Sequence, residues 1–247
     1  MCAEHSRKLK GVRDNRPIIL FVAGFGDNGS MFDGLTETHL AFSHRLLPIN
    51  LPGFGAAPLA EGTTLEALAQ YVSNEATKYE AETIVAHSVA SIIASLAARR
   101  ADCPLTKIVS LEGNITAADA YFSGTAADYA SPAEFRKAFL GRLDEMAKSE
   151  PIIRRYRDEV SKADPLALWQ LGIDARKFSS DHVPGEVLQH AANVTYLYNP
   201  DNCPEDTVRW LEENNMNHVI LENATHWPSV DQPEVLADKI AEALTEI

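Results

Sequence analysis

Ser88 has the sequence surroundings of a reactive serine. It follows an apolar run, Ile84–Val85, and precedes a helical stretch whose apolar face comprises Val89, Ile92, Ile93, Leu96 and Ala97. A serine at a strand-to-helix turn has its hydroxyl raised out of the sheet edge, next to backbone N–H groups that can bind an oxyanion. The tight turn favours small residues two positions to either side, here Ala86 and Ala90. The pattern therefore indicates a serine nucleophile.

A simpler interpretation is that Ser88 only caps the N-terminus of a helix. The chemistry decides between the two, because a serine hydroxyl near neutral pH needs a base within hydrogen-bond reach and an acid that orients this base. Three residues in distant segments could supply these groups: Glu112 and Asp201 each follow an apolar run, and His226 lies in a loop after the last one.

Apolar runs of strand length alternate with helical stretches along the chain. We expect strands at Pro17–Ala23, Arg45–Ile49, Thr83–Ala86, Lys107–Leu111, Val194–Tyr198 and His218–Leu221. Helices are expected at about Ser30–Phe42, from a capping box of Thr63 and Glu66 to Tyr79, after Ser88, up to Asn214, and after Pro233. This order predicts an α/β fold with a mostly parallel sheet, right-handed crossovers and helices on both faces.

Residues 115–192 interrupt the alternation, because they contain no convincing buried strand. A helix is expected to begin at Ser131, with proline and glutamate at its first and third positions, and further helices near 152–160, 165–171 and 187–191. The sequence thus predicts a core of residues 1–114 and 193–247 with a helical insertion, 115–192. We expect its aromatic residues, among them Phe135, Phe139 and Trp169, to pack against the core rather than to contact substrate.

The composition limits which kinds of partner and cofactor this protein is expected to bind. A formal net charge of −13 over 247 residues argues against binding to nucleic acid or to an anionic membrane. Cys2, Cys103 and Cys203 are too scattered for a zinc site or a disulfide framework, which favours reduced thiols in the cytoplasm. Residues 1–16 are polar, unlike a signal peptide, and no stretch is long and apolar enough to span a bilayer. The glycine-rich segment 24–29 lacks the spacing of a dinucleotide site.

Taken together, the order of these parts resembles the α/β-hydrolase fold superfamily. The residues that carry the resemblance are Ala23-Gly24-Phe25-Gly26, similar to an HGxG-type loop, Leu51-Pro52-Gly53-Phe54-Gly55, His87-Ser88 at the turn, and His226 before the last helix. The likeness covers nearly the whole chain except the insertion, which follows the sixth strand, where the family has its cap. Departures are Ala23 in place of the loop histidine, alanines in place of the glycines around the serine, and missing or reduced first antiparallel strands.

The resemblance implies a role for each candidate. Ser88 would be the nucleophile and His226 the base, with the backbone N–H groups of Phe25 and Val89 as the oxyanion hole. The acid stays open: most members carry it where Asp201 lies, although the aligned strand ends place Asn202 in that slot, and a minority carry it at the position of Glu112. Gly24 and Trp227 are expected to contact substrate. Such a site uses no metal and no cofactor.

The function expected from the resemblance is a serine hydrolase that cleaves a small, fairly apolar ester, thioester or lactone beneath a helical cap. Two alternatives remain open. One is other chemistry on the same frame, either carbon–carbon bond hydrolysis or a cofactor-free oxygenase with His226 as base. The other is a ligand receptor without catalysis. The expected partner is a small molecule, and the oligomeric state is left open, with a homodimer as one option.

Overall fold

A computed structural model of the chain describes residues 14–245. Most of the expected polar leader, residues 1–13, and with it Cys2, lies outside this range. Within the described residues, no helix combines the length and the apolar character that crossing a membrane requires.

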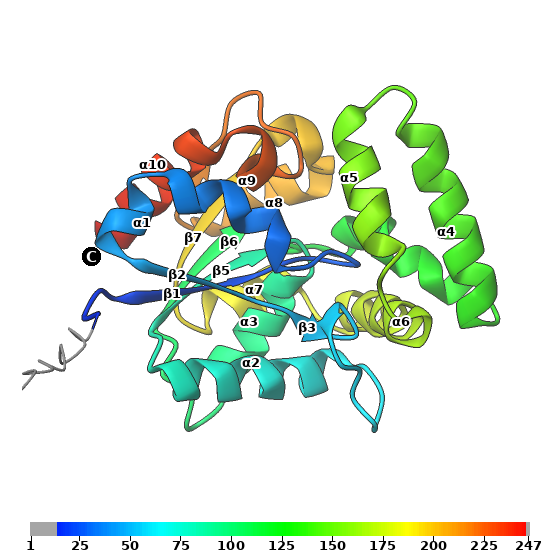
Figure 1. Cartoon of the computed structure of the whole chain (residues 1–247), viewed down its shortest axis with the longest axis horizontal. Coiled ribbons are helices and arrows are strands. Elements are labelled where there is room, and N and C mark those ends of the chain that lie inside the picture. Colours follow the sequence, from blue (N-terminus) through cyan, green and yellow to red (C-terminus); the bar gives the residue numbers. More distant parts are fainter. Residues whose placement is uncertain (1–13, 246–247) are drawn as a thin grey trace, which may run out of the picture.

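The centre of the molecule is a parallel sheet of six strands (Figure 1). Their order across the sheet is β2 (Arg45–Ile49), β1 (Ile18–Val22), β5 (Thr83–His87), β6 (Lys107–Leu111), β7 (Asn193–Tyr198) and β8 (His218–Ile220). All five neighbouring pairs are parallel, so the carboxyl ends of these strands meet along one edge. Two short strands, β3 (Leu51–Pro52) and β4 (Gly55–Ala56), pair beside it.

The apolar character of the central strands follows from burial on both faces. Four of the five residues in β1 are buried, as are four of five in β5 and in β6. A strand covered on both sides has no polar face, so its sequence is a continuous apolar run rather than an alternating one. The strands therefore lie within one residue of their expected bounds, and the expected α/β architecture is confirmed.

Helices cover both faces of the sheet (Figure 1). One face carries α2 (Leu65–Tyr79), α3 (Ala90–Ala98) and α7 (Pro184–Gln189), and the other carries η1 (Gly29–Glu37), α1 (Leu40–Ser43), α9 (Pro228–Asp231) and α10 (Pro233–Thr245). The link between β7 and β8 contains the 3₁₀ turn η4 (Pro200–Asn202) and α8 (Glu205–Asn214).

Between β6 and β7 the chain is entirely helical among its regular elements. These are η2 (Ala117–Tyr121), η3 (Ser123–Asp128), α4 (Pro132–Met146), α5 (Pro151–Val160), α6 (Pro165–Asp181) and α7. Helix α4 begins as expected, since the Ser131 side chain accepts a hydrogen bond from the backbone of Glu134. Helices α4, α5 and α6 lie together at one side of the molecule (Figure 1), where Phe135 and Phe139 of α4 pack against Phe25 in the loop after β1.

Two local expectations are wrong. Residues 30–42 form the 3₁₀ helix η1 followed by the single α-turn α1 rather than one α-helix. The side chains of Thr36 and Thr38 bond to carbonyls three residues earlier, an arrangement that competes with a regular α-helix. Helix α2 is capped by Thr64, whose side chain accepts from Ala67, and not by Thr63, which is buried beneath the helix start.

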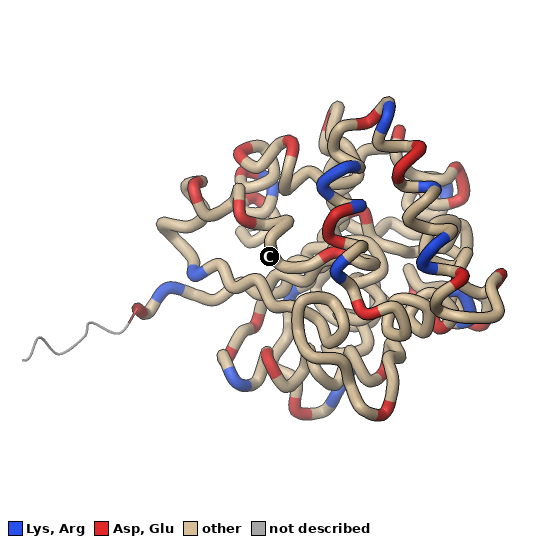
Figure 2. Tube along the Cα trace, turned by 45° about the vertical axis from the view of Figure 1, so that its right-hand side comes forward, with Lys and Arg blue, Asp and Glu red and all other residues tan. Residues whose placement is uncertain are grey.

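Charged residues lie mainly on the peripheral helices and loops (Figure 2). In this view, lysine and arginine positions are interspersed with aspartate and glutamate positions along the traced chain.

Candidate active site

Ser88 lies between β5 and α3 in a left-handed backbone conformation, with φ of 54°. Such a conformation costs a non-glycine residue about 1–3 kcal/mol and persists only where surrounding contacts enforce it. Here the Ser88 N–H donates to Leu111 O (2.9 Å), and its carbonyl accepts from the amides of Ser91 (3.0 Å) and Asn114 (3.3 Å). The backbone of β6 and its following loop therefore holds the serine at the carboxyl edge of the sheet.

Small residues surround this turn on every side. Ala86 and Ala90 are fully buried, as the small-x-Ser-x-small pattern requires. Gly24, in the loop after β1, lies directly against the serine, because a Cβ at that position would come within 2.8 Å of Ser88 Cβ and 2.9 Å of His87 Nδ1. The loop can approach the turn this closely only with glycine at position 24.

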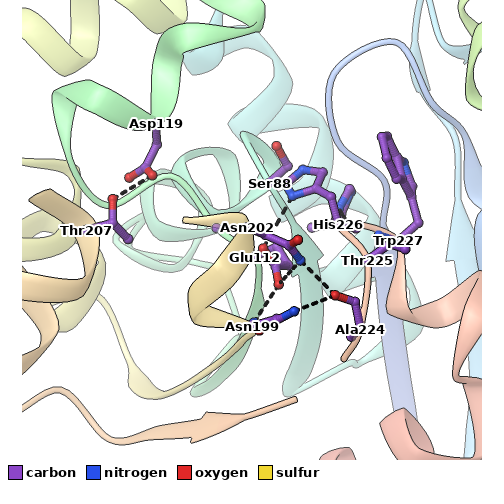
Figure 3. A network of polar contacts seen from close by, with 12 residues as sticks. Ser88, Glu112, Asp119, Asn199, Asn202, Thr207, Ala224, Thr225, His226 and Trp227 are labelled. Carbon is purple, nitrogen blue, oxygen red and sulfur yellow. Dashed lines mark hydrogen bonds and ion pairs between the residues drawn. The ribbon is translucent and has the colours of Figure 1, made fainter. Parts of the chain in front are cut away.

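His226 and Glu112 form a pair beside Ser88 (Figure 3). The His226 Nδ1 atom is 3.4 Å from Glu112 Oε2, with the imidazole 30% exposed and the carboxylate side chain 1% exposed. Because Nδ1 faces the carboxylate, Nε2 is the nitrogen left for a second partner. Ser88 and Glu112 are 24 positions apart in the chain, and Glu112 and His226 are 114 positions apart. The sheet brings all three to one edge, where the pair joins the segments that follow β6 and β8.

The Glu112 carboxylate is held by two asparagines at the end of β7. Its Oε1 accepts from the Asn199 backbone N–H (2.7 Å) and from Asn202 Nδ2 (3.1 Å). The side chains of both asparagines also donate to the carbonyl of Ala224, at 2.8 and 3.0 Å (Figure 3). One set of hydrogen bonds therefore fixes both the Glu112 carboxylate and the loop that carries His226.

His87 supports this loop from the other side. Its Nε2 lies 2.7 Å from the carbonyl of His226, and the two imidazole centroids are 4.7 Å apart. Burial, with His226 close by, holds the pKa of the His87 imidazole well below its ordinary value. Neutral His87 therefore donates from Nε2 to the carbonyl, while its buried Nδ1 has no hydrogen-bond partner among the described residues.

The Ser88 hydroxyl points to Asn114 in this structure. The Oγ atom donates to Asn114 Oδ1 at 3.4 Å, and among the described residues no hydrogen bond joins it to His226. Asn114 is itself held by a bond from its Nδ2 to the carbonyl of Asp119 (3.2 Å). Ser88 and His226 lie next to each other at the same edge of the sheet (Figure 3).

These residues line a cavity of about 390 Å³ between the sheet edge and helices of segment 115–192. Its wall includes Gly24, Phe25, Ser88, Glu112, Asn114, Tyr121, Phe122, Arg142, Met146, Ile153, Tyr156, Asp201, Asn202, Cys203, His226 and Trp227. The expected contact residues Gly24 and Trp227 are thus at the cavity, and so is Phe25, whereas Val89 lies behind Ser88 at the start of α3. Neither the Phe25 nor the Val89 amide donates to another residue within 14–245.

The two candidate acids differ in their contacts. Glu112 faces His226, whereas the exposed side chain of Asp201 makes no hydrogen bond or ion pair with any residue in the described part of the chain. Asn202, next to Asp201, contacts Glu112 instead. The geometry thus favours Glu112 over Asp201 as the partner of the imidazole. Within residues 14–245, no three His, Cys, Asp or Glu side chains are grouped to hold a metal ion.

The sequence did not point to Asn114, Asn199 or Tyr156. Asn199 follows β7 directly and Asn114 lies three residues after the end of β6, so their position at the carboxyl edge was available as a signal. Tyr156 is in α5, and its hydroxyl donates to the carbonyl of Phe25 (2.6 Å), 131 residues away. No local pattern indicates a contact over that separation.

Solved structures resemble the chain over nearly its whole length. An esterase from Exiguobacterium antarcticum has a TM-score of 0.74 at 15% identity and covers 93% of this chain and 92% of its own. A thermophilic esterase from Thermogutta terrifontis has 0.70 at 17%, with 92% and 89% covered. A 1H-3-hydroxy-4-oxoquinoline 2,4-dioxygenase has 0.71 at 15%, with 94% and 93% covered. At these identities the likeness shows the fold alone.

Comparison of the sequence itself identifies a family. No curated protein matches the chain. A family model does, over residues 19–239, and its description is "Alpha/beta hydrolase family". The matched range includes the loop after β1, the serine turn, Glu112 and His226. Together with the parallel sheet and its helical layers, this match shows that the chain belongs to the alpha/beta hydrolase family.

Proposed function

We propose that this protein is a serine hydrolase that cleaves a small, fairly apolar carboxylic ester, thioester or lactone. The observation that carries the proposal is the His226–Glu112 pair, 3.4 Å between Nδ1 and Oε2, at the wall of the cavity that Ser88 also lines. These are the three kinds of group that acyl transfer through a serine requires.

In the proposed mechanism, Ser88 rotates about χ1 from Asn114 and donates its proton to His226 Nε2 as Oγ attacks the substrate carbonyl. Glu112 keeps the proton of the imidazole on Nδ1 and stabilises the imidazolium that forms. The imidazolium then protonates the leaving group, which departs and leaves an acyl-Ser88 ester. Water, deprotonated by His226, attacks the acyl carbon of this ester. The bond to Ser88 Oγ breaks, the carboxylic acid leaves, and the imidazolium returns its proton to Oγ.

The negative charge of each tetrahedral intermediate would be bound by the backbone N–H groups of Phe25 and Val89. Both amides lack a partner among the described residues, and Gly24 allows the loop after β1 to lie against the serine. Donors placed in advance need no reorganisation when the charge develops, and the loss of one donor typically costs about 3 kcal/mol of transition-state stabilisation.

The cavity favours a small substrate with apolar parts. Its volume of about 390 Å³ lies near the lower end of the range of roughly 300–1,000 Å³ for small-molecule sites. Aromatic and aliphatic side chains form much of its wall, among them Phe122, Ile153, Tyr156 and Trp227. The helices of segment 115–192 would then act as a cap over the acyl or alcohol group.

Turnover of short p-nitrophenyl esters, combined with labelling by a serine-directed phosphonate, tests this proposal. We expect hydrolysis by the unmodified protein and one phosphonate per chain on Ser88. Ser88→Ala should abolish labelling and lower kcat/KM by several orders of magnitude. Labelling that survives the substitution would refute the assignment of the nucleophile.

A second candidate is a cofactor-free oxygenase, favoured by the hydrogen bond from Ser88 Oγ to Asn114 Oδ1. That bond leaves His226 Nε2 free to remove a proton from an acidic substrate, whose carbanion would react with O₂. The two functions differ in their need for the serine. For an oxygenase, Ser88→Ala would retain substrate-dependent O₂ uptake with a hydroxy-oxoquinoline, and His226→Ala would abolish it. For a hydrolase, both variants lose ester turnover and neither consumes O₂.

A further inference from the structure

Helix α5 contacts the loop after β1 through the side chains of Arg155, Tyr156 and Glu159. We call residues 24–30 the β1 loop. The contacts are Tyr156 Oη to Phe25 O (2.6 Å), Arg155 Nη1 to Asp27 Oδ2 (2.5 Å), Arg155 Nη2 to Ser30 Oγ (3.2 Å) and Asn28 Nδ2 to Glu159 Oε2 (2.6 Å). One helix of segment 115–192 is therefore bonded to the loop at residues 25, 27, 28 and 30.

Two of these contacts are buried. Tyr156 is 3% exposed and the Asp27 side chain 1% exposed. Loss of a hydrogen-bond partner at a buried position costs more free energy than loss of one on the surface. The Asp27–Arg155 pair is also charge-assisted, which makes it stronger than a neutral hydrogen bond. The contacts thus constrain the loop more than ion pairs on the surface would.

The backbone of the β1 loop explains why the bond to Phe25 matters. Residues 24–27 form a turn closed by a hydrogen bond from Asp27 N to Gly24 O (3.3 Å). The φ angle is +73° at Gly26 and not positive at Phe25, which is the φ pattern of a type II turn. The carbonyl of Phe25 belongs to the central peptide of this turn, and the Tyr156 hydroxyl holds it toward α5. A Cβ at position 26 would lie 2.8 Å from Val160 Cγ2, so α5 also packs on the turn itself.

We infer that α5 sets the position of the oxyanion-binding amide, with Tyr156 and Arg155 as positioning residues. The inference rests on the proposed function, in which the N–H of Phe25 binds the oxyanion. Tyr156 fixes the carbonyl of that same residue, and Arg155 fixes the loop two residues further on. The helical segment over the cavity therefore contributes to transition-state binding through the loop, in addition to enclosing the substrate.

The test combines kinetics with amide hydrogen exchange in Tyr156→Phe. This variant removes only the hydroxyl and keeps the ring that packs 5.0 Å from that of Trp227. We expect kcat for a p-nitrophenyl ester to fall roughly ten-fold or more with KM nearly unchanged, because the lost contact acts on the transition state. The amides of residues 27–30 are all hydrogen-bonded within the described structure, so their exchange reports opening of the loop and should become roughly five-fold faster.

Arg157→Gln is the matched control, because Arg157 is also in α5 but pairs with Asp144 of α4, within the helical segment. It should change neither kcat nor exchange of the loop. Arg155→Lys, which keeps a charge beside Asp27 but cannot bond Ser30 at the same time, should give an intermediate loss.

The outcomes separate the inference from the function on which it rests. Faster loop exchange with a fall in kcat supports the inference. Unchanged exchange in Tyr156→Phe, or faster exchange with an unchanged kcat, overturns it. If the unmodified protein neither hydrolyses esters nor reacts with the phosphonate at Ser88, the proposed function fails, and the inference about the oxyanion amide fails with it even where the exchange data show that α5 holds the loop.

Discussion

Two residues, Glu112 and Asp201, are candidates for the acid of the proposed triad, and two matched variants separate them. Glu112→Gln keeps the size of the side chain but removes the charge that faces His226 Nδ1. We expect kcat to fall by a factor on the order of 10³–10⁴, since the neutral side chain no longer stabilises the imidazolium. Asp201→Asn should change kcat by less than about three-fold. Ester kinetics on both variants decide the matter, and a larger loss in Asp201→Asn would reverse the assignment.

His87 gives a prediction for the dependence of stability on pH. Its pKa is held far below the ordinary value, mainly by burial, so the folded state stays unprotonated while the unfolded chain takes up a proton below about pH 6.5. The unfolded state then binds more protons, and stability is lost as the pH falls, by about 1.4 kcal/mol per pH unit from this residue alone. His87→Gln, which retains a donor for the carbonyl of His226, should show a shallower loss.

Urea unfolding of both proteins at several pH values between 7 and 5 measures this difference. Contributions from other titrating groups cancel when the two proteins are subtracted. Parallel stability curves would mean that His87 is protonated in the folded protein.

At the level of single helices, the start of α2 can be tested directly. The side chain of Thr64 is exposed and accepts a hydrogen bond from the Ala67 amide (3.1 Å). Thr64→Ala should lower the free energy of unfolding by about 1 kcal/mol, whereas Thr64→Ser should be near neutral. Ester turnover should be the same in all three proteins, because α2 lies away from the cavity. Equal stability of the alanine and serine variants would contradict the assignment of the cap.

Single strands and helices also show how much of the fold can be predicted from local sequence patterns. Strands buried on both faces are recognisable because no polar residue is tolerated in them, so β1, β5 and β6 lie where their apolar runs do. Residues 30–42 were expected to form one α-helix, but the hydroxyls of Thr36 and Thr38 bond to carbonyls three residues earlier, and η1 is a 3₁₀ helix. Helix propensity alone does not predict this competition between threonine hydroxyls and the backbone hydrogen bonds of an α-helix.

The candidate site also has one part that local sequence predicts and one part that depends on contacts between distant residues. Ser88 was recognisable from its own neighbours, because a turn without room for large side chains requires small residues such as Ala86 and Ala90 next to it in the sequence. The contacts of Glu112 with Asn199 and Asn202 join residues 87 and 90 positions apart. They depend on β6 and β7 being neighbours in the sheet, which the order of elements along the chain does not determine. The contacts that distinguish the two candidate acids therefore arise only in the tertiary structure.

At the level of the whole molecule, the hydrophobic core continues from the sheet into the helical segment. Phe25 of the β1 loop packs between both layers, with its ring centroid 5.6 Å from that of Phe139 and 6.2 Å from that of Phe135. We expect residues 115–192 to unfold together with the sheet in one cooperative transition. Calorimetry should give equal calorimetric and van't Hoff enthalpies. Two separate transitions would show that the segment is an independent folding unit.

The position of Glu112 also limits how this protein could be recombined with its relatives. Only Gly113 and Asn114 separate it from residue 115, where the helical segment was expected to begin, and a Cβ on Gly113 would come 2.1 Å from Ser110 Oγ. A chimera that exchanges the helical segment must therefore place its first junction at or after Ile115. A junction a few residues earlier would replace Glu112, the proposed acid, together with the helical segment, and His226 of the retained core would lose the carboxylate that faces its Nδ1.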